Sequence, residues 1–70
     1  MKIKVNGEEQ AVEGSSISIA QLLKLNEVEN PGMVTVQLDG EFVDKDNYEA
    51  TQVKENNEVE FLYYMGGGSV

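Results

Sequence analysis

Histidine, cysteine and tryptophan are absent from this 70-residue sequence, and proline occurs once. Without histidine the chain lacks the side chain that most often acts as a general base near neutral pH. Without cysteine it has no thiolate nucleophile, no disulfide and no soft metal ligand. These absences argue against an enzyme that relies on its own side chains for chemistry.

The short length narrows the possibilities further. A chain of this size forms one domain and buries about 60% of its unfolded surface, which leaves little room for a deep pocket beside the core. Carboxylates are plentiful, but Asp44-Lys45-Asp46-Asn47 lacks the downstream glycine and glutamate of a calcium loop. We therefore expect no metal site and no bound cofactor.

Acidic residues dominate the charge: thirteen Asp and Glu stand against five Lys, for a net charge of −8. Such a domain repels nucleic-acid phosphates, so nucleic acid is not an expected partner. The charge would steer the protein towards a basic partner surface, although an acidic surface also serves solubility alone.

Neither a signal peptide nor a membrane span is visible in the sequence. Met1-Lys2-Ile3-Lys4-Val5 alternates polar and apolar residues, and no long apolar segment follows it. No apolar run approaches the roughly 20 residues that cross a bilayer. Together with the lack of cysteine, these features predict a cytoplasmic protein that does not bind membranes.

The beginning of the chain predicts a β-hairpin. Ile3 and Val5 share one parity, as in a half-buried strand. Asn6-Gly7 follows them and is the strongest short hairpin signal, because both central turn residues need positive φ. The second strand is expected over residues 8–13, with Val12 as its main apolar anchor.

A short helix is predicted after a break at Gly14-Ser15-Ser16. Ser18 and Gln21 have the spacing of a capping box, and Ile17 precedes the cap as in a hydrophobic staple. Asn26 is the expected left-handed residue at the helix end. So short a helix must be held by packing its apolar face on a sheet, and that face consists of Ile19, Leu22 and Leu23.

The second half of the chain has the pattern of short strands around an irregular middle. Strands are expected at 33–38, from Phe42 onward, at 51–54 and at 58–65, with a helical turn at 44–48. Asp39-Gly40 and residues 55–57 form the turns between them. The whole pattern predicts an α+β domain, in which one helix covers one face of a sheet of four to five strands.

Three consecutive glycines, Gly66-Gly67-Gly68, follow the last predicted strand. Alone, such a run is typical of a frayed terminus. A tail without β-carbons is also thin and adopts almost any φ, so it can thread a narrow tunnel and present a carboxylate inside another enzyme. There the carboxylate can attack ATP and be converted to a thiocarboxylate, with every catalytic group supplied by the partner.

Several segments carry a resemblance to a known family: Met1 to Gly7, Ile17 to Leu25, Val36 to Tyr48 and Asn57 to Phe61, followed by Gly67-Gly68. In their order and spacing the chain resembles the thiamine-biosynthesis sulfur carriers (ThiS), which stand with the small subunit of molybdopterin synthase among the ubiquitin-like β-grasp carriers. The resemblance implies a β-grasp domain over residues 1–65 and a flexible tail over 66–70. It also implies that the first and last strands lie parallel at the centre of a mixed sheet.

In this family the terminal glycine is adenylated and then converted to a thiocarboxylate. Matched by its distance from the last strand, that residue is Gly68, and Gly66 and Gly67 belong to the same tail. The resemblance implies a carrier that is a monomer when free. Its expected partners are an E1-like adenylating enzyme of the ThiF type, which uses ATP and a sulfur donor, and a thiazole synthase of the ThiG type.

The sequence departs from the family at Ser69-Val70, because family members normally end at the second of the paired glycines. An amide at Gly68 cannot be adenylated. Three explanations are open: a peptidase trims the two residues and is then a further partner, they are a remnant of expression, or the protein no longer carries sulfur. Trimming would suit a carrier outside thiamine synthesis, for instance in a sulfur amino acid pathway.

Other functions are compatible with the same fold, since a fold alone does not settle function. The first is a sulfur carrier for molybdopterin or sulfur amino acid synthesis. The second is an inert β-grasp module that binds another protein. The third is a ubiquitin-like modifier joined to lysine side chains through Gly68.

The last strand also predicts a docking surface. If Val59, Phe61 and Tyr63 face the helix, strand alternation places Leu62 and Tyr64 on the other face, beside the tail. Contiguous exposed apolar residues usually mark contacts, although single exposed ones are common. We expect the docking surface for the partner enzymes to consist of Leu62, Tyr64 and Met65.

Overall fold

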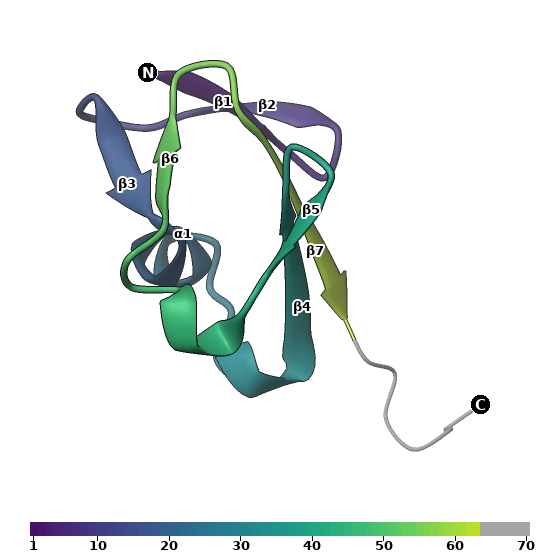
Figure 1. Cartoon of the computed structure of the whole chain (residues 1–70). Helices are drawn as coiled ribbons and strands as arrows, with labels where there is room; N and C mark the ends of the chain where they lie inside the picture. The colour runs from purple at the N-terminus through teal and green to yellow at the C-terminus, as the bar shows by residue number, and fades with distance from the viewer. Residues whose placement is uncertain (64–70) are drawn as a thin grey trace.

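A mixed five-stranded sheet and one α-helix make up the fold of residues 1–63, the part of the chain that the computed structural model describes (Figure 1). Two short strands form a second, smaller sheet. The strands are β1 (Lys2–Val5), β2 (Glu8–Ala11), β3 (Ser16–Ser18), β4 (Val34–Leu38), β5 (Glu41–Val43), β6 (Gln52–Lys54) and β7 (Glu58–Tyr63). The helix α1 spans Ile19–Leu25, and the 3-10 turns η1 and η2 span Pro31–Met33 and Lys45–Asn47.

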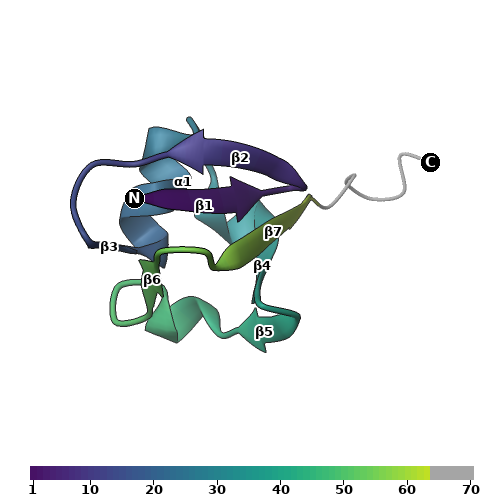
Figure 2. The same cartoon turned by 90° about the horizontal axis from the view of Figure 1, so that it is seen from above.

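Strands β1 and β7 lie inside the larger sheet and run parallel, with Lys4 opposite Glu58 and Val5 opposite Val59. The strand order is β2-β1-β7-β4-β5, and Figure 2 shows the strands following one another in this order, with α1 behind β1 and β2. Every other neighbouring pair is antiparallel. The predicted α+β fold, a mixed sheet under one helix with its first and last strands parallel, is therefore confirmed.

Two Asx-Gly turns close the hairpins of the larger sheet. Asn6 and Gly7 have φ of 53° and 87°, and Asp39 and Gly40 have φ of 52° and 88°. Positive φ at both central residues matches the twist of a two-residue hairpin, and Asn-Gly and Asp-Gly adopt it at little cost. Both predicted turns are confirmed.

Helix α1 begins at the predicted cap. The Oγ of Ser18 accepts a hydrogen bond of 3.1 Å from the backbone N–H of Gln21, which satisfies one of the free donors at the helix start. Ile17 is partly buried against the core, as expected for the residue before the cap.

The predicted left-handed role of Asn26 at the helix end is wrong. Asn26 has φ of −93°, and the next residue, Glu27, has φ of 61°. Glu27 N–H donates to Lys24 O at 3.0 Å and Val28 N–H donates to Leu23 O at 2.9 Å, which is the Schellman arrangement. The position after the cap is normally glycine, because a side chain in this conformation costs about 1 kcal/mol.

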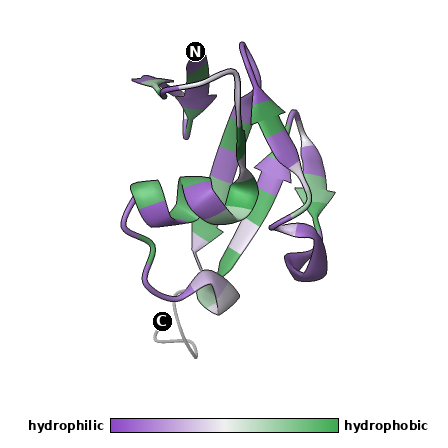
Figure 3. Cartoon of the chain, turned by 90° about the vertical axis from the view of Figure 1, so that its left-hand side faces the viewer, coloured by the Kyte–Doolittle hydropathy of each residue, from purple (hydrophilic) through white to green (hydrophobic). Residues whose placement is uncertain are grey.

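The core lies between α1 and the inner face of the larger sheet. Hydrophobic and hydrophilic residues alternate along the strands and around the helix in Figure 3, so each element presents one apolar face. Tyr48 is the one large residue with a polar tip in this core, and its hydroxyl donates to Val34 O at 3.1 Å. The buried apolar residues are Ile3, Val5, Val12, Ile19, Leu22, Leu23, Val34, Val36, Tyr48, Val53, Val59 and Phe61.

Some strand boundaries differ from the sequence prediction. Ser16 was assigned to a break, but it opens β3, in which Ile17 lies opposite Val53 of β6. The second strand ends at Ala11, and Val12 is buried beyond it, with its N–H bonded to Met1 O at 2.8 Å. Among the described residues, no helix has the length and apolar character needed to cross a membrane.

Candidate functional site

The chain approaches the glycine run through the C-terminal end of β7, at the end of the sheet away from the N-terminus (Figure 1). Gly68 lies five residues beyond Tyr63, the last described residue. Because an extended chain spans at most about 3.6 Å per residue, an enzyme that acts on Gly68 must bring its reacting atoms within about 18 Å of Tyr63. The predicted site residues Tyr64, Met65, Gly66, Gly67 and Gly68 lie outside the described part of the chain.

Leu62 is the predicted docking residue that the structure describes. It lies opposite Thr35 of β4 on the outer face of the sheet and is 43% exposed. Strand alternation accounts for this exposure, because the neighbouring Phe61 is buried. The docking role of Leu62 stays a prediction.

Phe42 is an exposed apolar residue that sequence reasoning did not select. It is 69% exposed and lies opposite Gln37, a strand-mate of Thr35 with the same parity. Phe42 on β5 and Leu62 on β7 therefore both lie on the outer face of the sheet, and β4 lies between their two strands. Its orientation follows only from the register of β5 on β4, which the sequence does not provide.

Tyr63 shares the side of β7 on which Val59 and Phe61 lie, but it is not buried as they are. It is 53% exposed. The reason is its position: it lies opposite Val34, the first residue of β4, and faces the loop that follows α1 rather than the helix itself. The last residue of β7 therefore lies beyond the part of the sheet that α1 covers.

Asn6, the residue after β1, holds β7 through two hydrogen bonds along the edge of β7 that faces β1. Its backbone N–H donates to Val59 O at 2.9 Å, and its side-chain Oδ1 accepts from Phe61 N–H at 2.8 Å. In a parallel pair, one residue bonds to two residues of its neighbour through its own N–H and C=O. Here the amide side chain replaces the C=O, so the backbone of Asn6 is able to turn while β7 keeps its partner.

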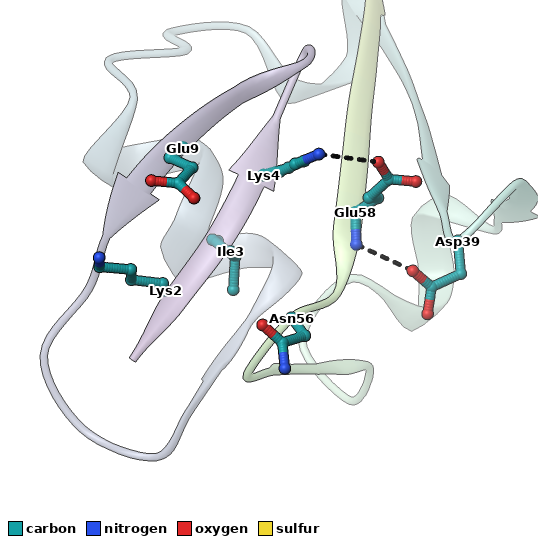
Figure 4. A pocket seen from close by; sticks show the side chains of 7 residues that line it. All are labelled: Lys2, Ile3, Lys4, Glu9, Asp39, Asn56 and Glu58. Carbon is teal, nitrogen blue, oxygen red and sulfur yellow. Dashed lines mark hydrogen bonds and ion pairs between the residues drawn. The ribbon is translucent and has the colours of Figure 1, made fainter.

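Charged residues gather at the opposite end of the sheet. An open depression of about 320 Å³ is lined by residues of both signs (Figure 4). Lys4 Nζ and Glu58 Oε2 are 4.0 Å apart, and Glu58 N–H donates to Asp39 Oδ1 at 2.8 Å. The depression is lined by Lys2, Ile3, Lys4, Glu9, Asp39, Asn56 and Glu58.

This depression offers no arrangement for acid–base chemistry or metal binding. The side chains of Lys4 and Glu58 are both more than half exposed, so water screens their charges. Within residues 1–63, no three carboxylates are grouped closely enough to hold a metal ion. The end of β7 remains the candidate site.

A single-helix β-grasp domain whose central last strand leads to a glycine run is the architecture of the ubiquitin-like β-grasp proteins. Comparison with known proteins gives the family: the sequence model of the ThiS family matches residues 3–68. The chain belongs to the ThiS family. The matched region includes Gly68 and excludes Ser69-Val70.

Two solved structures agree with this assignment. The crystal structure of thiamine biosynthesis protein ThiS from Geobacter metallireducens is 42% identical, with a TM-score of 0.85 over 97% of this chain and 100% of that one. The solution NMR structure of a thiamine biosynthesis protein from the same organism is 41% identical, with a TM-score of 0.80 over 100% of this chain and 91% of that one. No curated protein matches the chain.

Proposed function

We propose that this protein is the sulfur carrier of thiazole formation in thiamine biosynthesis. The observation that carries the proposal is the ThiS family match, which runs through the whole β-grasp domain and ends at Gly68. The two similar structures, both of thiamine biosynthesis proteins, support the same pathway. The carrier is a co-substrate of partner enzymes in the cytoplasm rather than an enzyme.

The chemistry takes place at the carboxylate of Gly68. A carboxylate oxygen attacks the α-phosphorus of ATP, which releases pyrophosphate and leaves an acyl-adenylate. Sulfur at the level of sulfide, delivered by the sulfur donor, then attacks the acyl carbon; the C–S bond forms as the C–O bond to AMP breaks, and loss of the proton leaves a thiocarboxylate. The base, the metal ion and the sulfur donor belong to the partner, since the carrier has neither histidine nor cysteine.

The Gly68 carboxylate forms only when the bond to Ser69 is hydrolysed. In the chain as given, the carbonyl of Gly68 is part of an amide, whose oxygen is a poor nucleophile towards ATP. A peptidase that cleaves after Gly68 therefore precedes the adenylating enzyme. Gly66 and Gly67 lack β-carbons, so the cleaved tail fits a narrow channel.

Two enzymes use the tail in turn. An E1-like adenylating enzyme of the ThiF type binds ATP and activates Gly68, and a thiazole synthase of the ThiG type receives the sulfur. Leu62, Tyr64 and Met65 form the docking surface, and of these three the structure describes Leu62, which is exposed on the outer face. The free carrier is a monomer.

The test is the intact mass of the protein after incubation with a ThiF-type enzyme, ATP and a sulfur source. The chain cut after Gly68 is expected to gain the mass difference between sulfur and oxygen, and the uncut chain is expected to stay unchanged. The uncut chain is thus the matched control, because it differs from the cut chain only in lacking a free carboxylate at Gly68. An unchanged mass of the cut chain would contradict the proposal, and a conjugate to lysine would indicate a protein modifier instead.

A further inference from the structure

A groove of about 300 Å³ lies beside Tyr63, on the helix side of the end of β7. It is bounded by the loop after α1, by η1 and by the first residue of β4. Two of its apolar side chains are strongly exposed, Met33 at 44% and Tyr63 at 53%. The full lining consists of Glu27, Val28, Glu29, Asn30, Met33, Val34 and Tyr63. We refer to it as the Tyr63 groove.

The Tyr63 groove and Leu62 lie on opposite faces of the same strand end. Leu62 points to the outer face of the sheet, and Tyr63, one residue later, points to the face that carries the helix. Gly68 is at most about 18 Å from Tyr63 and about 22 Å from Leu62, so an enzyme that takes up the tail must lie close to this strand end. Exposed apolar groups at such a place favour a contact with that enzyme.

The rim of the Tyr63 groove is acidic. Glu27 and Glu29 are both exposed, and within residues 1–63 neither forms an ion pair with a lysine. The cation that the structure places at η1 is Lys45, whose Nζ donates to Gly32 O at 2.8 Å. The net charge of −8 adds to the negative potential around them.

Glu27 also occupies a position that would be more stable with glycine. Its φ of 61° is the left-handed conformation at the end of the Schellman motif, where glycine is usual. Residues held in such conformations cluster at functional sites. A glutamate at this position therefore costs the fold about 1 kcal/mol relative to glycine, and the strained backbone coincides with the rim of the groove.

We propose that the Tyr63 groove binds a segment of the adenylating enzyme in which a lysine or arginine stands next to an apolar side chain. The cation pairs with Glu27 and Glu29, and the apolar side chain packs on Met33 and Tyr63. An enzyme that binds ATP phosphates needs cationic groups around its active site. When the tail enters that active site, the enzyme surface beside the entry faces the acidic rim of the groove, so cations there can pair with it. The inference rests on the proposed function and adds a second docking face to it.

The test measures the dissociation constant of the full chain with a ThiF-type adenylating enzyme by titration. The double variant Glu27→Gly with Glu29→Gln is expected to bind about tenfold more weakly at low salt, and the difference should shrink as salt is added. Met33→Gln is expected to weaken binding as well, without this salt dependence. Glu13→Gln is the matched control for Glu29→Gln, because it removes one exposed carboxylate far from the groove and should leave affinity within about twofold.

A second measurement separates a docking role of Glu27 from a structural one. Glu27→Gly alone is expected to raise the midpoint of thermal unfolding while it weakens binding, because glycine relieves the left-handed backbone. A structural role would move both quantities in the same direction. Equal affinity of parent and double variant would overturn the inference.

The two proposals fail in different ways. If the parent chain, cut after Gly68, acquires a thiocarboxylate at saturating enzyme and the groove variants bind like the parent, only the inference is overturned. If the parent acquires none, the proposed function fails and the inference fails with it.

Discussion

The side-chain Oδ1 of Asn6 accepts a 2.8 Å hydrogen bond from the backbone N–H of Phe61, and this bond joins the first hairpin turn to the last strand. Phe61 lies seven residues before Gly68. Asp39 makes a similar contact on the other side of β7, where its Oδ1 accepts from Glu58 N–H at 2.8 Å. Both residues occupy the first position of an Asx-Gly turn, so the same strand is held at two points by two equivalent turns.

Asn6→Gly is expected to loosen the strand end that leads to the tail. Glycine keeps the positive φ of the turn, so the substitution removes mainly the side-chain acceptor and leaves Phe61 N–H without its partner. We expect a loss of about 1–2 kcal/mol in the free energy of unfolding, measured by chemical denaturation. We also expect a higher apparent KM of the cut chain for the adenylating enzyme, because the tail leaves from a less fixed strand.

Asp39→Gly is the control for Asn6→Gly, because it removes the acceptor for the N–H of Glu58, three residues before Phe61 in β7. Asp39 also accepts from Asn57 Nδ2 at 2.7 Å, so this variant should destabilise the fold at least as much, but without raising KM. Equal effects of both variants on KM would mean that Asn6 acts through stability alone.

Local chemistry explains which parts of the fold could be predicted from the sequence. Asn6-Gly7, Asp39-Gly40 and Ser18 specify their turns and cap through their own side chains and backbone preferences, so no distant partner is needed. The role of the glycine run and the pathway it serves could be predicted only from a whole-chain resemblance, since glycines by themselves are equally typical of a chain terminus.

The parts that were missed depend on distant partners. Ser16 is part of β3 because it pairs with β6, a strand that comes more than thirty residues later in the sequence. Tyr63 is exposed because the cover provided by α1 ends before it. Glu27 was missed for a different reason: its left-handed conformation belongs to a local helix-end motif, but glycine or asparagine, not glutamate, is usual there. The Tyr63 groove could not be predicted, because it depends on how η1 and β4 lie against the end of β7.

Ser18→Ala is expected to weaken the start of α1. The substitution removes the acceptor for Gln21 N–H, and loss of such a cap costs about 1 kcal/mol. Thermal or chemical unfolding measures the effect. Ser15→Ala, an exposed residue ahead of β3, should change stability by less than about 0.5 kcal/mol, and a similar loss in both variants would contradict the capping role.

Leu22→Ala is expected to destabilise the domain by about 3 kcal/mol, because Leu22 is fully buried between α1 and the sheet. For a domain of this size that is a large part of the total stability. Leu25→Ala offers the same chemical change on the same helix at a residue that is 52% exposed, and it should cost less than about 1 kcal/mol. Equal losses would show that the helix face has been assigned wrongly.

Leu62→Asp and Tyr64→Asp are expected to weaken binding to the adenylating enzyme while the domain stays folded. Leu62 is 43% exposed on the outer face, so its replacement leaves no cavity in the core, and a carboxylate there interrupts an apolar contact. We expect at least about a tenfold rise in the dissociation constant for each variant, which corresponds to about 1.4 kcal/mol. Circular dichroism of the free variants checks that the fold is kept.

Ala11→Asp is the matched control for these two substitutions. Ala11 belongs to the edge strand β2 and lies opposite Lys2 of β1, so it is also an exposed, outward-facing apolar residue. It is two strands away from β7, which carries Leu62. The variant has the same net charge as Leu62→Asp, which removes any difference in long-range repulsion. If Ala11→Asp binds as weakly as Leu62→Asp, the loss comes from added charge, and the outer face beside the tail is not the docking surface.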